Sequence, residues 1–158
     1  MSVNMRLLTA RTRDRQTRGL RDFLTACQDS VGIPASEIQI VDPETTAHVV
    51  NAISSHIQDG IAAGAISRQN ELTWDQVVTL LDLHISRWQN VIPIVFLSHY
   101  EDFLLRLPFA SFVENLQRLL SFDGDTIYCV SSDLQMGFGV DIYPSELVHA
   151  TRFAVDTW

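Results

Sequence analysis

The stretch from Val91 to Tyr143 decides the fold of this chain, and it opens with the apolar run Val91-Ile92-Pro93-Ile94-Val95-Phe96-Leu97. This run is rich in β-branched residues and too short for a buried helix, which predicts a buried strand. A polar turn over 98–102 leads to a second predicted strand, Phe103 to Leu107, which Pro108 ends.

A helix and two further strands are predicted in the rest of this stretch. Ser111 and Glu114 have capping-box spacing and precede a leucine stripe on one helical face. The turn sequence Asp123-Gly124-Asp125 ends that helix. Strands are predicted over 126–131 and 137–143. In the second, Phe138, Val140 and Ile142 point inward, and Gly139, Asp141 and Tyr143 point outward. The result is a strand–strand–helix–strand–strand module, with a helix on one face of the sheet.

The residues before Val91 are predicted to be mostly helical. Helices are predicted over 12–28, 44–63 and 73–88 from apolar residues at helical spacing. Thr73 and Gln76 form a second capping-box pattern. A short strand is predicted over 37–41, and the polar run Ser67–Asn70 is predicted to be a loop. The segment from Ser145 to Trp158 fits either a last helix or an edge strand.

These elements predict an α+β fold in which N-terminal helices pack on a mainly antiparallel sheet. The 158 residues contain no repeat or linker, which predicts a single compact domain with a mostly helical part at 1–90 and a sheet-containing module at 91–158. No apolar run approaches the ~18 residues that span a bilayer, and no signal-peptide pattern is present. Cys27 and Cys129 fall in apolar patterns, which predicts buried, reduced thiols. We therefore expect a cytoplasmic protein with no membrane association.

Charge is distributed unevenly along the chain. All 11 basic residues are arginine, and six of them fall within residues 1–21 beside one acid, Asp14. From Asp22 onward there are five arginines and 18 acids, a net charge of −13. Such an acidic body repels nucleic acid and anionic membranes and favours a basic partner. The same negative charge is also explained if it only keeps the protein soluble. A further alternative is that the basic N-terminal helix binds nucleic acid.

The sequence contains no pattern of residues that indicates an enzyme. The absence of lysine excludes Schiff-base chemistry and the phosphate-binding lysines of kinases and P-loop proteins. No metal-binding motif, nucleophile elbow or complete phosphate loop occurs, so we expect no cofactor and no metal. One alternative stays open: a small enzyme or ligand-binding domain that uses the His99–Asp102 turn with Tyr128 or Asp141.

The acids of the 91–150 region fall mainly in turns and at strand ends. If the strands lie side by side, several carboxylates gather at one end of the sheet and attract a cationic protein, with nearby aromatic rings as anchors. Ordinary solvated turns would give the same pattern. The predicted contact residues are Tyr100, Glu101, Asp102, Asp123, Asp125, Asp133, Phe138, Asp141, Tyr143 and Glu146.

Several segments of this region also resemble a known class of proteins. They are Ile92–Phe96, Phe103–Pro108 running into the Ser111–Leu120 helix, Gly124–Tyr128, Ser131–Asp133 and Gly137–Tyr143. This arrangement resembles immunity proteins of bacterial polymorphic toxin systems, including those of contact-dependent growth inhibition. The resemblance covers about residues 91–150 and transfers no individual residue role. It implies a non-enzymatic cytoplasmic inhibitor that binds one cognate toxin domain, often a basic nuclease, and blocks its active site or substrate surface.

Overall fold

Seven strands of the described chain form one antiparallel sheet in the order β1-β4-β3-β5-β6-β7-β2. The computed structural model describes residues 18–100, 103–143 and 151–158, except for the side chains of residues 43, 44 and 143. The strands are β1 (Gln39–Ile40), β2 (Ser67–Leu72), β3 (Ile94–Leu97), β4 (Leu105–Arg106), β5 (Thr126–Val130), β6 (Gly137–Tyr143) and β7 (Arg152–Thr157). The predicted α+β fold with a mainly antiparallel sheet is confirmed.

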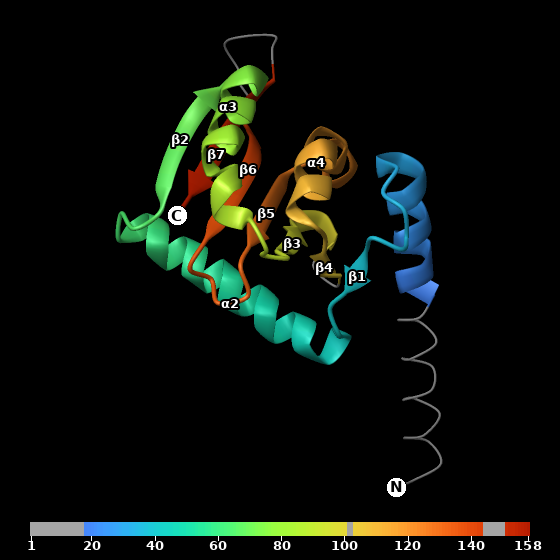
Figure 1. Cartoon of the computed structure of the whole chain (residues 1–158). Coiled ribbons are helices and arrows are strands. Elements are labelled where there is room, and N and C mark those ends of the chain that lie inside the picture. Colours follow the sequence, from blue (N-terminus) through green and yellow to red (C-terminus); the bar gives the residue numbers. More distant parts are fainter. Residues whose placement is uncertain (1–17, 101–102, 144–150) are drawn as a thin grey trace, which may run out of the picture.

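Helices cover both faces of this sheet. The helix at 18–31, α3 (Trp74–His84) and α4 (Phe109–Asp123) pack on one face, and α2 (Pro43–Ala62) packs on the other. Figure 1 shows the 18–31 helix at the β1 end of the sheet and α3 at the β2 end. Short 3-10 helices follow α3 and β3, namely η1 (Ile85–Trp88) and η2 (Ser98–Tyr100). The sequence predicts a helix on one face, whereas α2 supplies a second helical layer.

The helix ends show which local signals were read correctly. The Thr73 capping box with Gln76 is present at the start of α3. Gly124 ends α4 in the left-handed conformation, at φ 82°. The capping box predicted at Ser111 is wrong, because α4 already begins after Pro108. The Ser111 hydroxyl instead donates to Glu37 at 2.7 Å.

Two segments were read differently from the sequence. The run predicted as a loop, Ser67–Asn70, belongs to β2, an edge strand that is exposed almost throughout and is therefore polar. The chain end forms β7, which lies between β6 and β2 and is an inner strand. Because β2 pairs with β7 and β1 pairs with β4, one sheet joins residues from before and after Val91. The predicted helix start at 12–17 and the segment at 145–150 lie outside the described residues.

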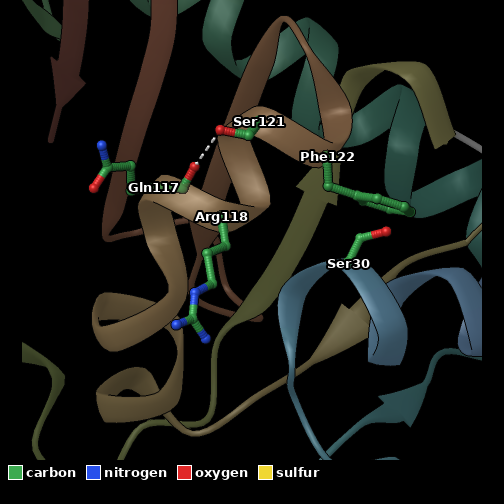
Figure 2. Close-up of a pocket in the computed structure, with 5 residues that line it drawn as sticks. All are labelled: Ser30, Gln117, Arg118, Ser121 and Phe122. Carbon is green, nitrogen blue, oxygen red and sulfur yellow. Dashed lines mark hydrogen bonds between the residues drawn. The ribbon is translucent and has the colours of Figure 1, made fainter.

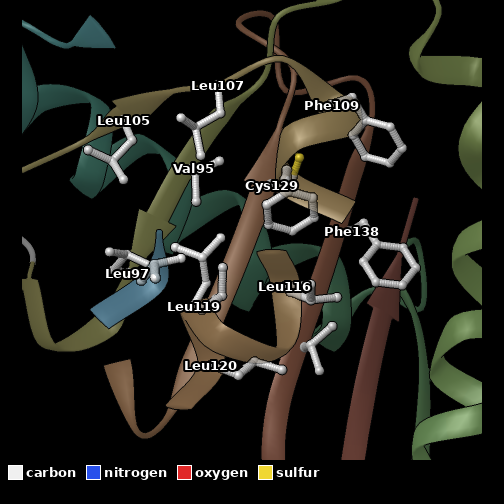
Figure 3. Close-up of a cluster of buried hydrophobic side chains, with 14 of the residues drawn as sticks. Val95, Leu97, Leu105, Leu107, Phe109, Leu116, Leu119, Leu120, Cys129 and Phe138 are labelled. Atoms are coloured by element: carbon white, nitrogen blue, oxygen red, sulfur yellow. The ribbon is translucent and has the colours of Figure 1, made fainter. Parts of the chain in front are cut away.

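The larger core lies between the sheet and the helices α3, α4 and 18–31. Inward residues of β3, β5 and β6, such as Val95, Cys129 and Phe138, meet the leucines of α4 there (Figure 3). Phe112 and Leu116 of α4 are completely buried in this layer. On the other face, Ile53 and Ile57 of α2 pack against a smaller cluster that includes residues of β3 and β5. The apolar contacts thus fix both helical layers around the central strands.

Candidate functional site

Three of the acids predicted as contact residues meet at one end of the sheet, and we call Asp123, Asp125 and Asp141 the acidic end. Asp123 ends α4, Asp125 precedes β5, and Asp141 pairs with Thr126 across β5 and β6. The Thr126 hydroxyl oxygen lies 3.3 Å from Asp125 Oδ1 and 3.0 Å from Asp141 Oδ1. Because a hydroxyl has one hydrogen, it donates to one of these carboxylates at a time.

Asp123 is held by the turn that follows β3. Its Oδ2 accepts a hydrogen bond from Ser98 Oγ at 2.8 Å, and its Oδ1 accepts from the His99 backbone N–H at 2.9 Å. Ser98 Oγ also lies 3.2 Å from Asp125 Oδ2. Asp123 is only 5% exposed, so it fastens the end of α4 to η2. The structure therefore does not place Asp123 on the surface where the sequence predicts it.

Four residues form a row across β5, β6, β7 and β2 on the side of the sheet that faces α2. Tyr128 pairs with Gly139, Gly139 with Asp156, and Asp156 with Arg68, and we call these four the cross-strand row. The Tyr128 hydroxyl reaches past β6 and donates to Asp156 Oδ2 at 3.0 Å. A Cβ at Gly139 would lie 2.2 Å from Tyr128 Cε1. Glycine at this position therefore leaves the space that the tyrosine ring needs.

Arg68 joins the cross-strand row to the acidic end. Its Nη1 lies 3.3 Å from Asp156 Oδ2, and its Nη2 lies 2.8 Å from Asp141 Oδ2. The exposed fraction is 31% for the Arg68 side chain, 25% for Asp141 and 2% for Asp156. Polar contacts thus run without interruption from Tyr128 on β5 through β7, β2 and β6 to the turn after β3.

The buried carboxylate of Asp156 dominates the electrostatics of this row. Burial raises the pKa of Asp156, while the Arg68 charge and the Tyr128 hydrogen bond act in the opposite direction. Asp156 Oδ1 has no hydrogen-bond partner among the described residues. Burial and the nearby Asp156 charge also raise the pKa of Tyr128, so this hydroxyl remains a hydrogen-bond donor at neutral pH.

Sequence reasoning missed Arg68 and Asp156. Arg68 lies in the polar run read as a loop, and Asp156 lies in the segment left undecided between helix and strand. A usable signal was the alternation in the last segment, where Ala154 and Asp156 are on the face opposite Phe153 and Val155. An acid on the buried face of a strand requires a charged or hydrogen-bonding partner.

Asp133 lies away from the acidic end. It belongs to the turn between β5 and β6, at the opposite end of that hairpin from the Thr126–Asp141 pair. Its Oδ1 accepts from Ser131 Oγ at 2.6 Å and from the Gln135 backbone N–H at 3.1 Å. These hydrogen bonds lower the pKa of Asp133. The exposed carboxylate therefore stabilises its own turn and does not extend the acidic end.

The predicted aromatic anchors are largely used within the fold. Phe138 is completely buried in the larger core, so its prediction as a surface anchor is wrong. Its inward place in the alternation of β6 is the physical reason. Tyr100 is half-buried, and its ring stacks on Phe122 with centroids 4.7 Å apart. Glu101, Asp102, Glu146 and the side chain of Tyr143 lie outside the described residues.

The alternative prediction of an enzyme or ligand-binding domain combines the His99–Asp102 turn with Tyr128 or Asp141. Asp141 belongs to the acidic end, whereas His99 and Tyr128 make different contacts. His99 Nδ1 lies 2.7 Å from the backbone oxygen of Asp123, and its side chain is 60% exposed. The Tyr128 hydroxyl donates to Asp156 in the cross-strand row. The geometry therefore gives no specific support to a shared reaction centre for these two residues.

Both thiols have the surroundings of structural cysteines, as predicted. Cys27 and Cys129 are free and buried. Burial raises the pKa of Cys27 to about 11 and raises that of Cys129 well above its ordinary value. The thiols are therefore protonated at neutral pH and lack the thiolate that acts as a nucleophile. Among the described residues, no group of three or more His, Cys, Asp or Glu side chains is arranged to hold a metal ion.

The chain was compared with protein-family models, curated proteins and solved structures. None of the three comparisons found a match. In the described part of the chain, no helix combines the length and apolar character needed to cross a membrane.

A cavity of about 530 Å³ lies between the 18–31 helix and α4. Ser30 comes from the first of these helices, and Gln117, Arg118, Ser121 and Phe122 come from the second (Figure 2). Arg118 Nη1 donates to the backbone oxygen of Val31 at 3.3 Å, at the C-terminal end of the first helix. None of the predicted contact residues lines this cavity. Arg118 serves here as a cap for the neighbouring helix.

Proposed function

We propose that this protein is a non-enzymatic immunity protein that binds and neutralises a cognate bacterial toxin domain in the cytoplasm. The toxin is a basic domain, of which a nuclease is the best example. Two features support the proposal: the resemblance of residues 91–150 to immunity proteins of polymorphic toxin systems, and the negative surface of the fold.

One observation carries the proposal: the exposed carboxylates of the described residues form no ion pairs with the described arginines. Among these residues, arginine ion pairs are made only by Arg68, to Asp141 and Asp156. The exposed carboxylates are Asp22, Asp29, Glu37, Asp42, Asp59, Glu71, Asp75, Asp82, Glu114, Asp125 and Asp133. Uncompensated charge of one sign attracts a partner of the opposite sign and accelerates their encounter.

Other described arginines are engaged in contacts within the fold. Arg87 Nη1 donates to the backbone oxygen of Trp158 at 3.1 Å, and Arg106 Nη1 donates to Ser132 Oγ at 3.2 Å. Arg118 caps the first helix as described above. Four of the described arginines, Arg68, Arg87, Arg106 and Arg118, thus bind parts of the fold to one another, whereas most of the described carboxylates face solvent.

The test requires a candidate toxin domain, which we expect a neighbouring gene to encode. We expect tight 1:1 binding in stopped-flow or surface plasmon resonance measurements, and an association rate that falls as salt is raised from low to physiological ionic strength. Absence of binding, or an association rate that salt does not change, would contradict the proposal.

Two single variants test whether the acidic end takes part in binding the toxin. Asp125→Asn removes an exposed charge at the acidic end, and Glu114→Gln removes an exposed charge on α4. Glu114 lies nine residues before the end of α4 at Asp123, which is about 14 Å along the helix axis. If the acidic end faces the toxin, Asp125→Asn slows association more than Glu114→Gln at low salt. Equal effects would show that only overall charge matters.

A further inference from the structure

The large hydrophobic side chains that are exposed in the described chain fall within one stretch of sequence, residues 78–92. They are Val78, Leu83, Ile85 and Ile92, with exposed fractions of 39%, 69%, 46% and 51%. Three of them belong to α3 and η1. Isolated exposed apolar residues are ordinary on a protein surface, but a local group of them indicates a contact surface.

The outer face of α3 alternates acidic and apolar residues. Asp75, Val78, Asp82 and Ile85 are separated by three, four and three positions, so they fall on one side of the helix, and we call them the α3 stripe. All four are exposed. The inner side of the same helix is buried through Val77 and Leu81. The stripe is therefore exposed to solvent beside the buried side of the helix, and its side chains have no hydrogen-bond or ion-pair partner among the described residues.

The position of the α3 stripe is well defined. The Thr73 capping box fixes the start of the helix, with the Thr73 backbone N–H donating to Gln76 Oε1 at 2.8 Å. Packing of Val77 and Leu81 into the larger core sets its rotation. A partner thus meets a preformed surface, which lowers the entropic cost of association.

The net charge of the protein indicates which class of partner can bind the α3 stripe. Residues 18–158 contain seven arginines and 18 acids, a net charge of −11. The whole chain has a net charge of −8, so two copies repel each other, and nucleic acid and anionic lipid are repelled as well. A positively charged protein surface that also carries apolar side chains matches both components of the α3 stripe.

We propose that the α3 stripe is the surface that holds the positively charged toxin domain, through a segment in which Arg or Lys alternates with apolar residues. This inference rests on the proposed function and adds to it the location of the contact. Asp75 and Asp82 steer the basic segment, and Val78 and Ile85 supply the apolar contact that slows its release.

The test compares two double variants with the wild type in binding to the candidate toxin domain of the preceding test. Val78→Ala with Ile85→Ala should raise the dissociation rate about tenfold with little change in the association rate. Asp75→Asn with Asp82→Asn should lower the association rate several-fold at low salt and much less at high salt. The matched control is Asp22→Asn with Asp29→Asn, which removes the same charge from the helix at the opposite end of the sheet (Figure 1).

The outcomes separate this inference from the proposed function. If the wild type binds tightly and neither α3 double variant changes the binding more than the control does, the α3 stripe is not the contact surface. The proposed immunity function is then unaffected. No binding by the wild type overturns both. Sedimentation equilibrium of the protein alone provides a further check, because a dimer that the Val78 and Ile85 changes abolish would make the stripe a self-association surface. All variants should keep the wild-type melting temperature within a few degrees, since the four side chains are exposed.

Discussion

The two faces of the sheet are stabilised in different ways. On the side of α3 and α4, residues such as Val95, Phe138 and Val155 are buried against apolar helices. On the α2 side, the apolar cluster includes Phe96 and Tyr128, and the row then continues through Gly139 and Asp156 to Arg68. The first face depends on shape and burial, and part of the second depends on paired charges. Acids that hold strands together in this way are less available to a partner than acids on the outer helix faces.

The largest effect should come from the apolar face. Phe112 is completely buried on α4. Phe112→Ala should lower the free energy of unfolding by about 3–5 kcal/mol, because it removes a large apolar side chain and leaves a cavity. Urea unfolding followed by circular dichroism measures this change. If Phe112→Ala lowers the free energy of unfolding less than Arg68→Gln does, the apolar face is not the more stabilising of the two.

A smaller effect is expected at the crossing of Tyr128 over β6. Gly139→Ala should cost about 1–3 kcal/mol, because the added methyl group overlaps the buried ring. The hydrogen bond from Tyr128 to Asp156 restrains the ring from moving away. The cost should shrink in a Tyr128→Ala background, which empties the space. If Gly139→Ala lowers the free energy of unfolding equally in the wild type and in Tyr128→Ala, the effect comes from the backbone and not from overlap with the ring.

Charge pairing on the α2 side can be tested at Arg68. Arg68→Gln leaves Asp156 buried without its cation and should cost about 1–2 kcal/mol, a value reduced by the partial exposure of the guanidinium. The control is Arg106→Gln, because among the described residues the Arg106 guanidinium has one polar contact, to the Ser132 hydroxyl at 3.2 Å. The control should change the free energy of unfolding by less than about 0.5 kcal/mol. Similar losses for the two variants would remove the special role of Arg68.

The pH dependence gives the most subtle test. The raised pKa of Asp156 means that the folded protein holds this proton more tightly than the unfolded chain does. The contribution of Asp156 to stability is therefore full below the unfolded pKa of about 3.9 and is lost as pH rises through the folded pKa. Between pH 3 and pH 7, the wild type should lose stability relative to Asp156→Asn. Denaturant titrations at several pH values measure this difference, and a trend of opposite sign would contradict it.

Most of the fold could be predicted because local signals and apolar patterns agreed with the tertiary structure. The strands around Val95, Cys129 and Val140 are buried and β-branched or apolar, and Gly124 ends its helix as its turn sequence indicates. The errors occurred where stability comes from distant partners. β2 is polar because it is an exposed edge, and β7 has an acid, Asp156, on its buried face, so neither has a clear pattern without its neighbour.

The site was less predictable than the fold for a related reason. Strand order places Asp123, Asp125 and Asp141 together, as expected, and places Asp133 at the other end of a hairpin. Sequence alone did not show that Asp123 is buried or that Asp141 is paired with Arg68. The α3 stripe was not predicted, because helical spacing assigns the apolar side chains of Val78 and Ile85 to the same stripe as Val77 and Leu81, whereas the structure exposes them.

The position of β7 between β6 and β2 has a consequence for folding. The contact between Arg68 and Asp156 spans 88 residues of chain, so β2 gains its only strand neighbour in the described sheet from a distant segment. Closing so long a loop is entropically costly, and such pairings form slowly. We expect amide protons of β2 to become protected from solvent exchange after those of β5 during refolding, with the sheet completed from its centre toward this edge.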